Sequence, residues 1–333
     1  MKIAIKDNSS FVIRHSYFAR SIALTVPRRT RDNAAFMAVQ EINANHLIES
    51  RFPGLIQKVQ EIIRDSENTY EGHGGHSESH LWEHTMHVTA IACRLAYSEK
   101  IDPLIPSIAA LFHDAGKFSG GHYHSKNTIE EEESARIAER LLRQFGMKKA
   151  DIRRVLSGLR ALYNEKAAKN IVAAIIHDAD FLSKFGALGV AGFFTKSVLR
   201  GRTLRSSILG YLSKELTYAA CLPLNMHTAA GRKLAKTKSA DSLKFFRSLL
   251  DELKDARISN LKIRHMRIPV PHSGKRFFKV RLVVSPACPE CNGPWDMVWA
   301  TEKGIKCTKL NIDWDCSRCG KRLETSFCLP EIA

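Results

Sequence analysis

Histidine and aspartate residues gather in one stretch of this sequence. Nine of the 14 histidines fall between residues 73 and 177. The pair His113-Asp114 ends an apolar run and precedes Gly116-Lys117. A charged pair there would be costly to bury unless it binds something. Imidazole nitrogen with carboxylate oxygen suits Fe, Mn, Co, Ni or Zn, and Mg less well. The pair therefore predicts a metal site.

Helix spacing supplies further candidate ligands on both sides of this pair. Three upstream histidines are spaced i, i+4 and i+7 and would share one helix face: His80, His84 and His87. Downstream, His177 and Asp180 are three residues apart and would also share a face, while Asp178 would point away from them. The spacing alone does not choose among these residues.

Helical patterns must position these side chains. From about residue 78 to 258 the pattern is nearly all helical, with apolar residues repeating at helix spacing. The expected helices include one after Glu83, one from Pro103 to the His-Asp pair, and one at the four glutamates 130–133. Others are expected at 150–163 and 168–185, and the 207–257 stretch continues helical. An earlier helical region, 33–66, should break near Pro53-Gly54. Residues 260–285 alternate and predict two strands joined by a turn.

Four segments together resemble the HD superfamily of metal-dependent phosphohydrolases. They read HLWEHTMHVTAIACRLA, AALFHDAGKF, EEEESARIAERLL and IIHDADFLSKFGALGVAGFF. The similarity covers roughly residues 78–255. It implies an all-helical HD-domain bundle. Together with the β pattern that follows, this predicts a mainly α chain with a small C-terminal β module.

The resemblance also implies the ligand set. His84 matches the first motif, because it stands four residues before Val88. His113 and Asp114 match the paired motif, and Asp180 matches the last aspartate, with Asp178 as the alternative. These residues would hold Mn, Fe, Co or Ni, or alternatively Mg.

Other residues near the motifs are expected to support the metal ligands or to contact the phosphate. Asp114 would also orient a water molecule, and Lys117 would neutralise the phosphate, unless it is only a solvated lysine. His124 is the first choice for a phosphate contact, with a plain surface histidine as the alternative. Four further residues are candidates for supporting the ligands: His80, His122, His177 and Asp178.

The C-terminal cysteines predict a second metal site. Six of the eight cysteines follow residue 287, and four form the pairs Cys288-x-x-Cys291 and Cys316-x-x-Cys319. Four thiolates around zinc are a common structural site, and the segment resembles a zinc ribbon. With no secretory signal, the spacing favours metal over disulfides and predicts a cytoplasmic protein. Cys307 and Cys328 would be spare thiols, either of which could replace an assigned ligand.

The charge of the chain indicates an anionic partner. The formal net charge is +17, and residues 201–283 hold 18 Lys plus Arg against 5 Asp plus Glu, a balance of +13. Such a field attracts nucleic acid or nucleotides. A merely solvated basic surface is the alternative. No apolar run is long enough to span a bilayer, so no membrane association is expected.

We therefore expect a nuclease or phosphodiesterase acting on RNA or DNA. The alternatives are a phosphohydrolase of nucleotides or nucleotide second messengers, and a non-catalytic nucleic-acid-binding scaffold. Four parts are predicted: residues 1–70 of unknown role, the HD domain at 71–258, a β linker at 259–285 and the zinc module at 286–333.

Overall fold

The computed structural model describes residues 43–71, 79–121, 130–164, 166–269, 277–303 and 307–330. The chain divides into two compact units, Met1–Ala38 and Val39–Ala333, and every described residue belongs to the second. The division of the chain at residues 70, 258 and 285 stays a prediction.

Helices make up most of the described residues, which confirms the mainly α class. The α-helices are α2 (Ala44–Glu49), α3 (Leu55–Glu71), α4 (His80–Ser98), α5 (Leu104–Phe112), α6 (Glu130–Gln144), α7 (Lys149–Ala161), α8 (Ile171–Ser183), α9 (Gly186–Leu199), α10 (Leu204–Cys221) and α11 (Ala229–Asp255). Short 3₁₀ turns are η1 (Ser119–Gly121), η2 (Ala167–Lys169) and η3 (Leu222–Leu224). None of the helices described here has the length and apolarity needed to cross a membrane.

Local sequence explains most helix boundaries. The predicted break at Pro53-Gly54 separates α2 from α3. The four glutamates 130–133 form the first turn of α6, where the helix dipole favours negative charge. The helical stretch expected over 207–257 is confirmed, and it consists of α10 and α11, separated by η3 and the following turn. Pro223 lies in η3, and proline lacks the N–H that a continuous helix would need.

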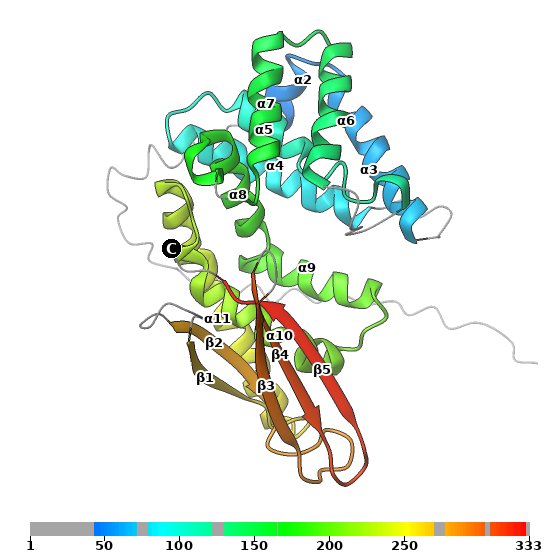
Figure 1. Ribbon diagram of the computed structural model, residues 1–333, viewed down its shortest axis with the longest axis vertical. Helices are drawn as coiled ribbons and strands as arrows, with labels where there is room; N and C mark the ends of the chain where they lie inside the picture. Colours follow the sequence, from blue (N-terminus) through cyan, green and yellow to red (C-terminus); the bar gives the residue numbers. More distant parts are fainter. Residues whose placement is uncertain are drawn as a thin grey trace, which may run out of the picture. The chain divides into compact units, whose positions relative to one another are not determined.

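One apolar core joins the helices that carry the histidine motifs. It includes Val88 and Leu95 of α4, Phe112 of α5 and Ile175 of α8, all at most 2% exposed. Helix α4 packs against both α5 and α8, and α5, α6 and α7 lie side by side (Figure 1). Burial of these faces is the main stabilising term. It places one face of α4 opposite one face of α8.

A second cluster connects the helices to a two-stranded sheet. It joins α9, α10 and α11 through Val190, Leu212 and Phe246. Strands β1 (Lys262–Pro269) and β2 (Phe277–Val284) pair antiparallel, with Lys262 opposite Val284. β2 packs on α10, where the Ser213 hydroxyl accepts the Val283 N–H at 2.9 Å. The two predicted strands are thus part of the packed structure.

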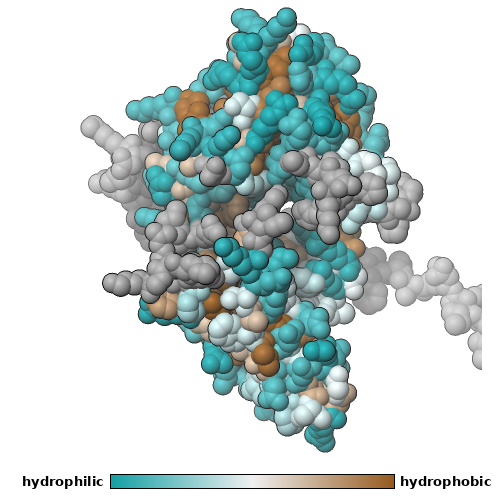
Figure 2. Space-filling model, in the orientation of Figure 1, coloured by the Kyte–Doolittle hydropathy of each residue, from teal (hydrophilic) through white to brown (hydrophobic). Residues whose placement is uncertain are grey.

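The C-terminal sheet has the order β3–β4–β5. Its strands are β3 (Asp296–Lys303), β4 (Thr308–Asp315) and β5 (Arg322–Cys328), all antiparallel. Trp295 and Trp314 stack with ring centroids 5.8 Å apart, whereas Trp299 is 38% exposed. The Tyr218 hydroxyl of α10 donates to the Cys328 carbonyl at 2.7 Å and ties the sheet to the helices. On the face drawn in Figure 2, the described residues are largely hydrophilic with small apolar patches.

Candidate metal centre

Four side chains predicted as ligands converge from three helices. His84 lies on α4, His113 and Asp114 directly follow α5, and Asp180 lies on α8. His84 Nε2 is 3.1 Å from Asp180 Oδ1 and 3.7 Å from Asp114 Oδ2. His113 Nε2 is 3.6 Å from Asp114 Oδ2. Ligand atoms of His84, His113 and Asp180 therefore face one point, and Asp114 lies beside the two histidines.

The hydrogen bonding of the two ring nitrogens of His113 fits a metal ligand. Its Nδ1 lies 2.7 Å from the Ala110 carbonyl, which can only accept, so Nδ1 carries the proton. Nε2 then has a free lone pair, and it is buried without a hydrogen-bond partner among the described residues. Ligand atoms of His84, His113 and Asp180 all lie within 4.8 Å of one another. A buried, unpartnered nitrogen beside carboxylates is what a divalent ion would satisfy.

Asp114 is held as a carboxylate by its neighbours. Lys117 donates to Asp114 Oδ2 at 2.7 Å. Burial raises the pKa of the Asp114 carboxyl, but Lys117, His113 and His84 outweigh burial and leave this pKa well below its ordinary value. The group is thus charged and ready to bind a cation. The predicted phosphate contact of Lys117 stays a prediction, and the structure adds its ion pair with Asp114.

Asp180 is positioned by two residues that sequence reasoning missed. Its Oδ2 accepts from Lys184 Nζ at 2.7 Å and from the Tyr163 hydroxyl, which leaves Oδ1 facing His84. Burial raises the pKa of Asp180, but Lys184 and His84 outweigh it and keep the pKa well below the ordinary value. The positive φ of 62° at Tyr163 is unusual for a tyrosine and aims the ring back toward α8. No sequence motif marks Tyr163 or Lys184.

Contacts from α3 and α8 also fix the position of His84. The Ser183 hydroxyl donates to the Asp180 carbonyl at 2.7 Å and lies 3.3 Å from His84 Nδ1. At the start of α4, the buried Glu67 of α3 accepts the Ser79 hydroxyl and, at 3.2 Å, the Leu81 N–H. These bonds satisfy donors at the helix N-terminus and fix its angle.

The His-Asp turn is fixed against α6 by another missed residue. The Ser134 hydroxyl donates to the His113 carbonyl at 3.0 Å and accepts the Gly116 N–H at 2.9 Å. A Cβ at Gly116 would lie 2.5 Å from Ser134 N and 2.7 Å from the Glu130 carbonyl. Only glycine allows this approach, which explains the glycine in the motif.

Asp178, the alternative to Asp180, has another role in the structure. It is fully buried and accepts the N–H groups of His227 and Thr228, both at 2.8 Å, and the Thr228 hydroxyl at 2.7 Å. A Cβ at Gly231 would lie 2.2 Å from its Oδ2. Asp178 therefore holds the start of α11, while Asp180 faces His84.

The remaining predicted site residues that the structure describes lie on two helices, His177 on α8 and His80 on α4. His177 Nδ1 lies 3.2 Å from Asp178 Oδ1, and its ring packs 4.2 Å from that of His227, so it belongs to the α8–α11 contact. His80 lies one turn before His84, and its Nδ1 is buried without a hydrogen-bond partner among the described residues. The positions of His122 and His124 lie outside the described residues.

The four predicted zinc ligands meet in the C-terminal module. The sulfur atoms of Cys288, Cys291, Cys316 and Cys319 lie within 4.8 Å of one another. Cys288 Sγ is 3.6 Å from Cys319 Sγ, and Cys291 Sγ is 3.5 Å from Cys316 Sγ. Sulfur atoms at these separations fit a tetrahedral zinc site, and the cluster is compatible with a zinc ribbon.

The interpretation of Cys307 and Cys328 as spare ligands is wrong. They form a disulfide, with sulfur atoms 2.08 Å apart. The register explains the contact: Cys307 precedes β4, and Lys309 of β4 is opposite Cys328 of β5. The expected preference for metal over disulfides is wrong for Cys307 and Cys328, whereas the other four cysteines are free thiols in an arrangement compatible with zinc.

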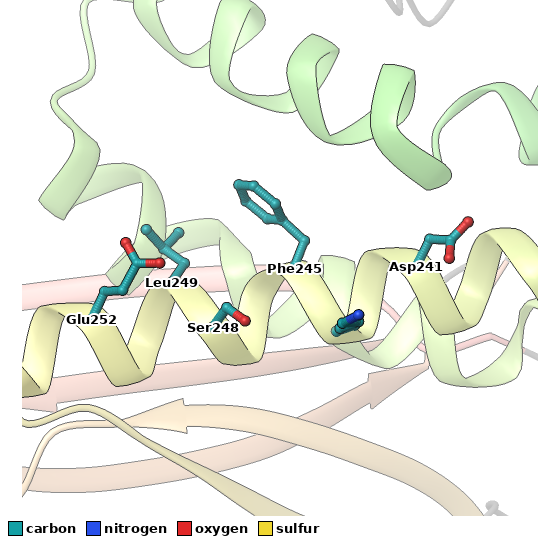
Figure 3. Close-up of a pocket in the computed structure, with 6 residues that line it drawn as sticks. Asp241, Phe245, Ser248, Leu249 and Glu252 are labelled. Atoms are coloured by element: carbon teal, nitrogen blue, oxygen red, sulfur yellow. The ribbon is translucent and has the colours of Figure 1, made fainter. Parts of the chain in front are cut away.

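One pocket on the helices lies away from these predicted residues. It is lined by Asp241, Lys244, Phe245, Ser248, Leu249 and Glu252, all of α11 (Figure 3). Phe245 and Leu249 are four residues apart and project from the same side of the helix (Figure 3). None of the predicted metal ligands lines it.

Replacing Tyr163 with Phe should weaken divalent metal binding. The variant keeps the ring but removes the hydroxyl that holds Asp180 Oδ2. Loss of a bond that orients a ligand typically costs about 10–100-fold in metal affinity, and we expect the lower end because Lys184 remains. Titration of the chain with Mn²⁺ by calorimetry measures this. Tyr97→Phe, at an exposed tyrosine of α4, is the control. Equal affinities for both variants would contradict the role of Tyr163.

Acid should destabilise the helical fold as pH falls from about 6.5 to about 4. Burial, followed by nearby positive charge, lowers the pKa of His80 and of His87 from 6.5 to about 4. The unfolded chain therefore binds more protons in this window, and stability falls with pH until both states are protonated. Each histidine contributes up to about 3 kcal/mol. Urea unfolding followed by helical circular dichroism from pH 7.5 to 4.5 measures the loss. His87→Gln should make the pH dependence shallower, and an unchanged slope would contradict the assignment.

The chain is similar to a known domain family and to several solved structures. Residues 81–184 match the HD domain family, and this segment contains all four predicted ligands. The structure is similar to Bacillus subtilis YpgQ at 21% identity, with a TM-score of 0.45 over 69% of this chain and 99% of YpgQ. It is also similar to a predicted HD superfamily hydrolase from an uncultured Thermotogales bacterium at 22% identity, with a TM-score of 0.44 over 63% of this chain and 99% of that protein. No curated protein matches the sequence. The chain therefore contains an HD domain, in residues 81–184.

Proposed function

We propose that this chain is a metal-dependent phosphohydrolase, and specifically a nuclease or phosphodiesterase that acts on RNA or DNA. The observation that carries the proposal is the buried, unpartnered Nε2 of His113 opposite His84, Asp114 and Asp180. A divalent ion held by these residues would polarise a phosphoryl oxygen and lower the pKa of its water. Mn, Fe, Co or Ni suits this mixed ligand set, with Mg as an alternative.

The chain's own residues supply binding and charge around the ion. Lys117 and Lys184 lie 2.7 Å from Asp114 and Asp180, so each ligand carboxylate has a lysine beside it. Both ammonium groups are in position to attract a phosphate and to offset the charge that develops during hydrolysis. Asp114 and Asp180 stay ionised because of these neighbours, and they are the groups available to orient water.

A metal-dependent hydrolysis assay tests the proposal. The full chain is assayed with Mn²⁺, Ni²⁺, Co²⁺ or Mg²⁺ against single-stranded RNA, single-stranded DNA, nucleotides and bis(p-nitrophenyl) phosphate. We expect hydrolysis of the diester and cleavage of a polymer, both lost in EDTA and in His113→Ala. Cleavage of nucleotides alone would favour the nucleotide phosphohydrolase. The absence of hydrolysis with every metal would overturn the proposal in favour of the scaffold.

A further inference from the structure

A group of cations extends from the metal centre along α9 to the start of α10. Residues 196–205 contain Lys196, Arg200, Arg202 and Arg205 and no Asp or Glu. Lys196 lies in the last turn of α9 and Arg200 is the C-cap residue that follows it, so the two are four residues apart on one side of the helix end, and both are exposed. We call Lys196, Arg200, Arg202 and Arg205 the basic corner. None of its members forms an ion pair with another described residue.

Electrostatic interactions connect the basic corner to the metal centre. The positive charges of Lys196 and Arg200 help to lower the pKa of His80, which lies one turn before the predicted ligand His84. Lys196 is also repelled by Lys117 and Lys184, the two lysines that donate hydrogen bonds to Asp114 and Asp180. The corner and the metal centre are therefore neighbouring parts of one positive region.

Among the described residues, the four cations of the basic corner have no acidic ion-pair partner, whereas Lys117 and Lys184 are paired with Asp114 and Asp180. Loss of solvation, then repulsion from Arg200, Lys117, Lys184 and Lys214, lowers the pKa of Lys196 to about 8. Glu215 interacts electrostatically with Lys196, and burial raises the pKa of Glu215. Cations held together against their repulsion form a site that an anion stabilises.

The arrangement fits a ligand that carries several phosphates in a row. A phosphate at the metal centre would lie near Lys117 and Lys184, and Lys196 and Arg200 have no ion-pair partner among the described residues. A nucleic-acid strand places further phosphates beside the one being cut, whereas a mononucleotide ends there. We propose that Lys196 and Arg200 bind the backbone phosphates of single-stranded RNA or DNA next to the phosphodiester at the metal centre. This inference rests on the proposed function and names its substrate class.

Salt-dependent binding tests the two residues. A fluorescein-labelled 12-nucleotide single strand is titrated with the full chain by fluorescence anisotropy, in a His113→Ala background that prevents cleavage. Lys196→Gln with Arg200→Gln should weaken binding at least about 10-fold at low salt and reduce the slope of log K against log salt by about 1.4, since each single-strand phosphate contact contributes about 0.7.

Lys148 and Lys149 provide a matched control. Both are exposed and begin α7, whereas Tyr163, which contacts Asp180, lies just beyond its other end. The 13-residue helix separates them from the site by about 20 Å. Lys148→Gln with Lys149→Gln removes the same charge and should change affinity less than about 2-fold, with a slope change well below 1.4. Equal losses in both double variants would overturn the inference, because net charge alone would then explain binding.

Two further measurements separate this inference from the proposed function. A labelled mononucleotide should bind much more weakly than the 12-nucleotide strand, and equal affinity would overturn the strand-binding role. Binding of the corner to vesicles of anionic phospholipid, without binding of the strand, would overturn it too. The hydrolysis of bis(p-nitrophenyl) phosphate by the unaltered chain depends only on the metal centre. If that hydrolysis occurs while the strand fails to bind, the inference fails and the metal-dependent phosphohydrolase of the proposed function stands.

Discussion

Asp180→Asn is expected to abolish metal binding while the helices stay folded, and Asp178→Asn is expected to do the reverse. The two residues lie two positions apart on α8 and were indistinguishable as candidates by residue type. Asp180 Oδ1 is 3.1 Å from His84 Nε2, so an amide there removes an anionic ligand. Affinity for Mn²⁺ should fall by at least about 100-fold, since even bonds that only orient a ligand are worth 10–100-fold. Metal-dependent hydrolysis should fall with it.

The effect of Asp178→Asn should appear in stability. Asp178 accepts three hydrogen bonds from His227 and Thr228 in a fully buried position. An asparagine there places an NH₂ group against donors and leaves at least one of them unsatisfied. We expect a loss of about 3 kcal/mol in the free energy of unfolding, the upper end for a buried unsatisfied group. Mn²⁺ affinity should change little.

Calorimetric titration with Mn²⁺ and urea unfolding of both variants check this pair of expectations. Each variant serves as the control for the other, because the substitution and the helix are the same. If Asp178→Asn loses the metal and Asp180→Asn keeps it, the ligand assignment is wrong. If each variant loses both Mn²⁺ affinity and stability, the two roles on α8 are not separate.

Cys316→Ser is expected to remove one zinc ion per chain and to unfold the β3–β4–β5 sheet. The four sulfur atoms lie within 4.8 Å of one another, and Cys316 is buried among them. A small sheet buries little apolar surface, so bound zinc supplies much of its folding free energy, on the order of 10 kcal/mol in small zinc domains. The contact of Tyr218 with the Cys328 carbonyl should be lost, while the helices around α4, α5 and α8 stay folded.

Zinc content and near-ultraviolet circular dichroism measure this change. The stacked rings of Trp295 and Trp314 report on the folded sheet. Cys93→Ala, in the buried face of α4, is the control and should leave both signals unchanged. A Cys316→Ser chain with unchanged zinc content and tryptophan signal would show that these cysteines do not hold zinc.

Sequence-local features of the site could be predicted because their geometry depends on neighbouring residues alone. The His113-Asp114 pair, its glycine and the helix break at Pro53-Gly54 are of this kind. The spacing Cys-x-x-Cys likewise brings two sulfur atoms together within one turn, whatever surrounds it. The helical pattern on both sides of Pro223 predicts a helical stretch there, but it does not give the boundary between α10 and α11.

By itself, the sequence determined the mainly helical class, the order of the ligand motifs and the cysteine pairs, since each follows from short-range spacing. The tertiary structure alone decided that Asp180 faces His84 while Asp178 holds α11. It also placed Tyr163, Lys184 and Ser134 around the ligands and joined Cys307 to Cys328. Helix periodicity defines which residues share a face, but packing of α8 between α4 and α11 decides what each face meets. That packing depends on apolar contacts between residues far apart in the chain, which no local pattern contains.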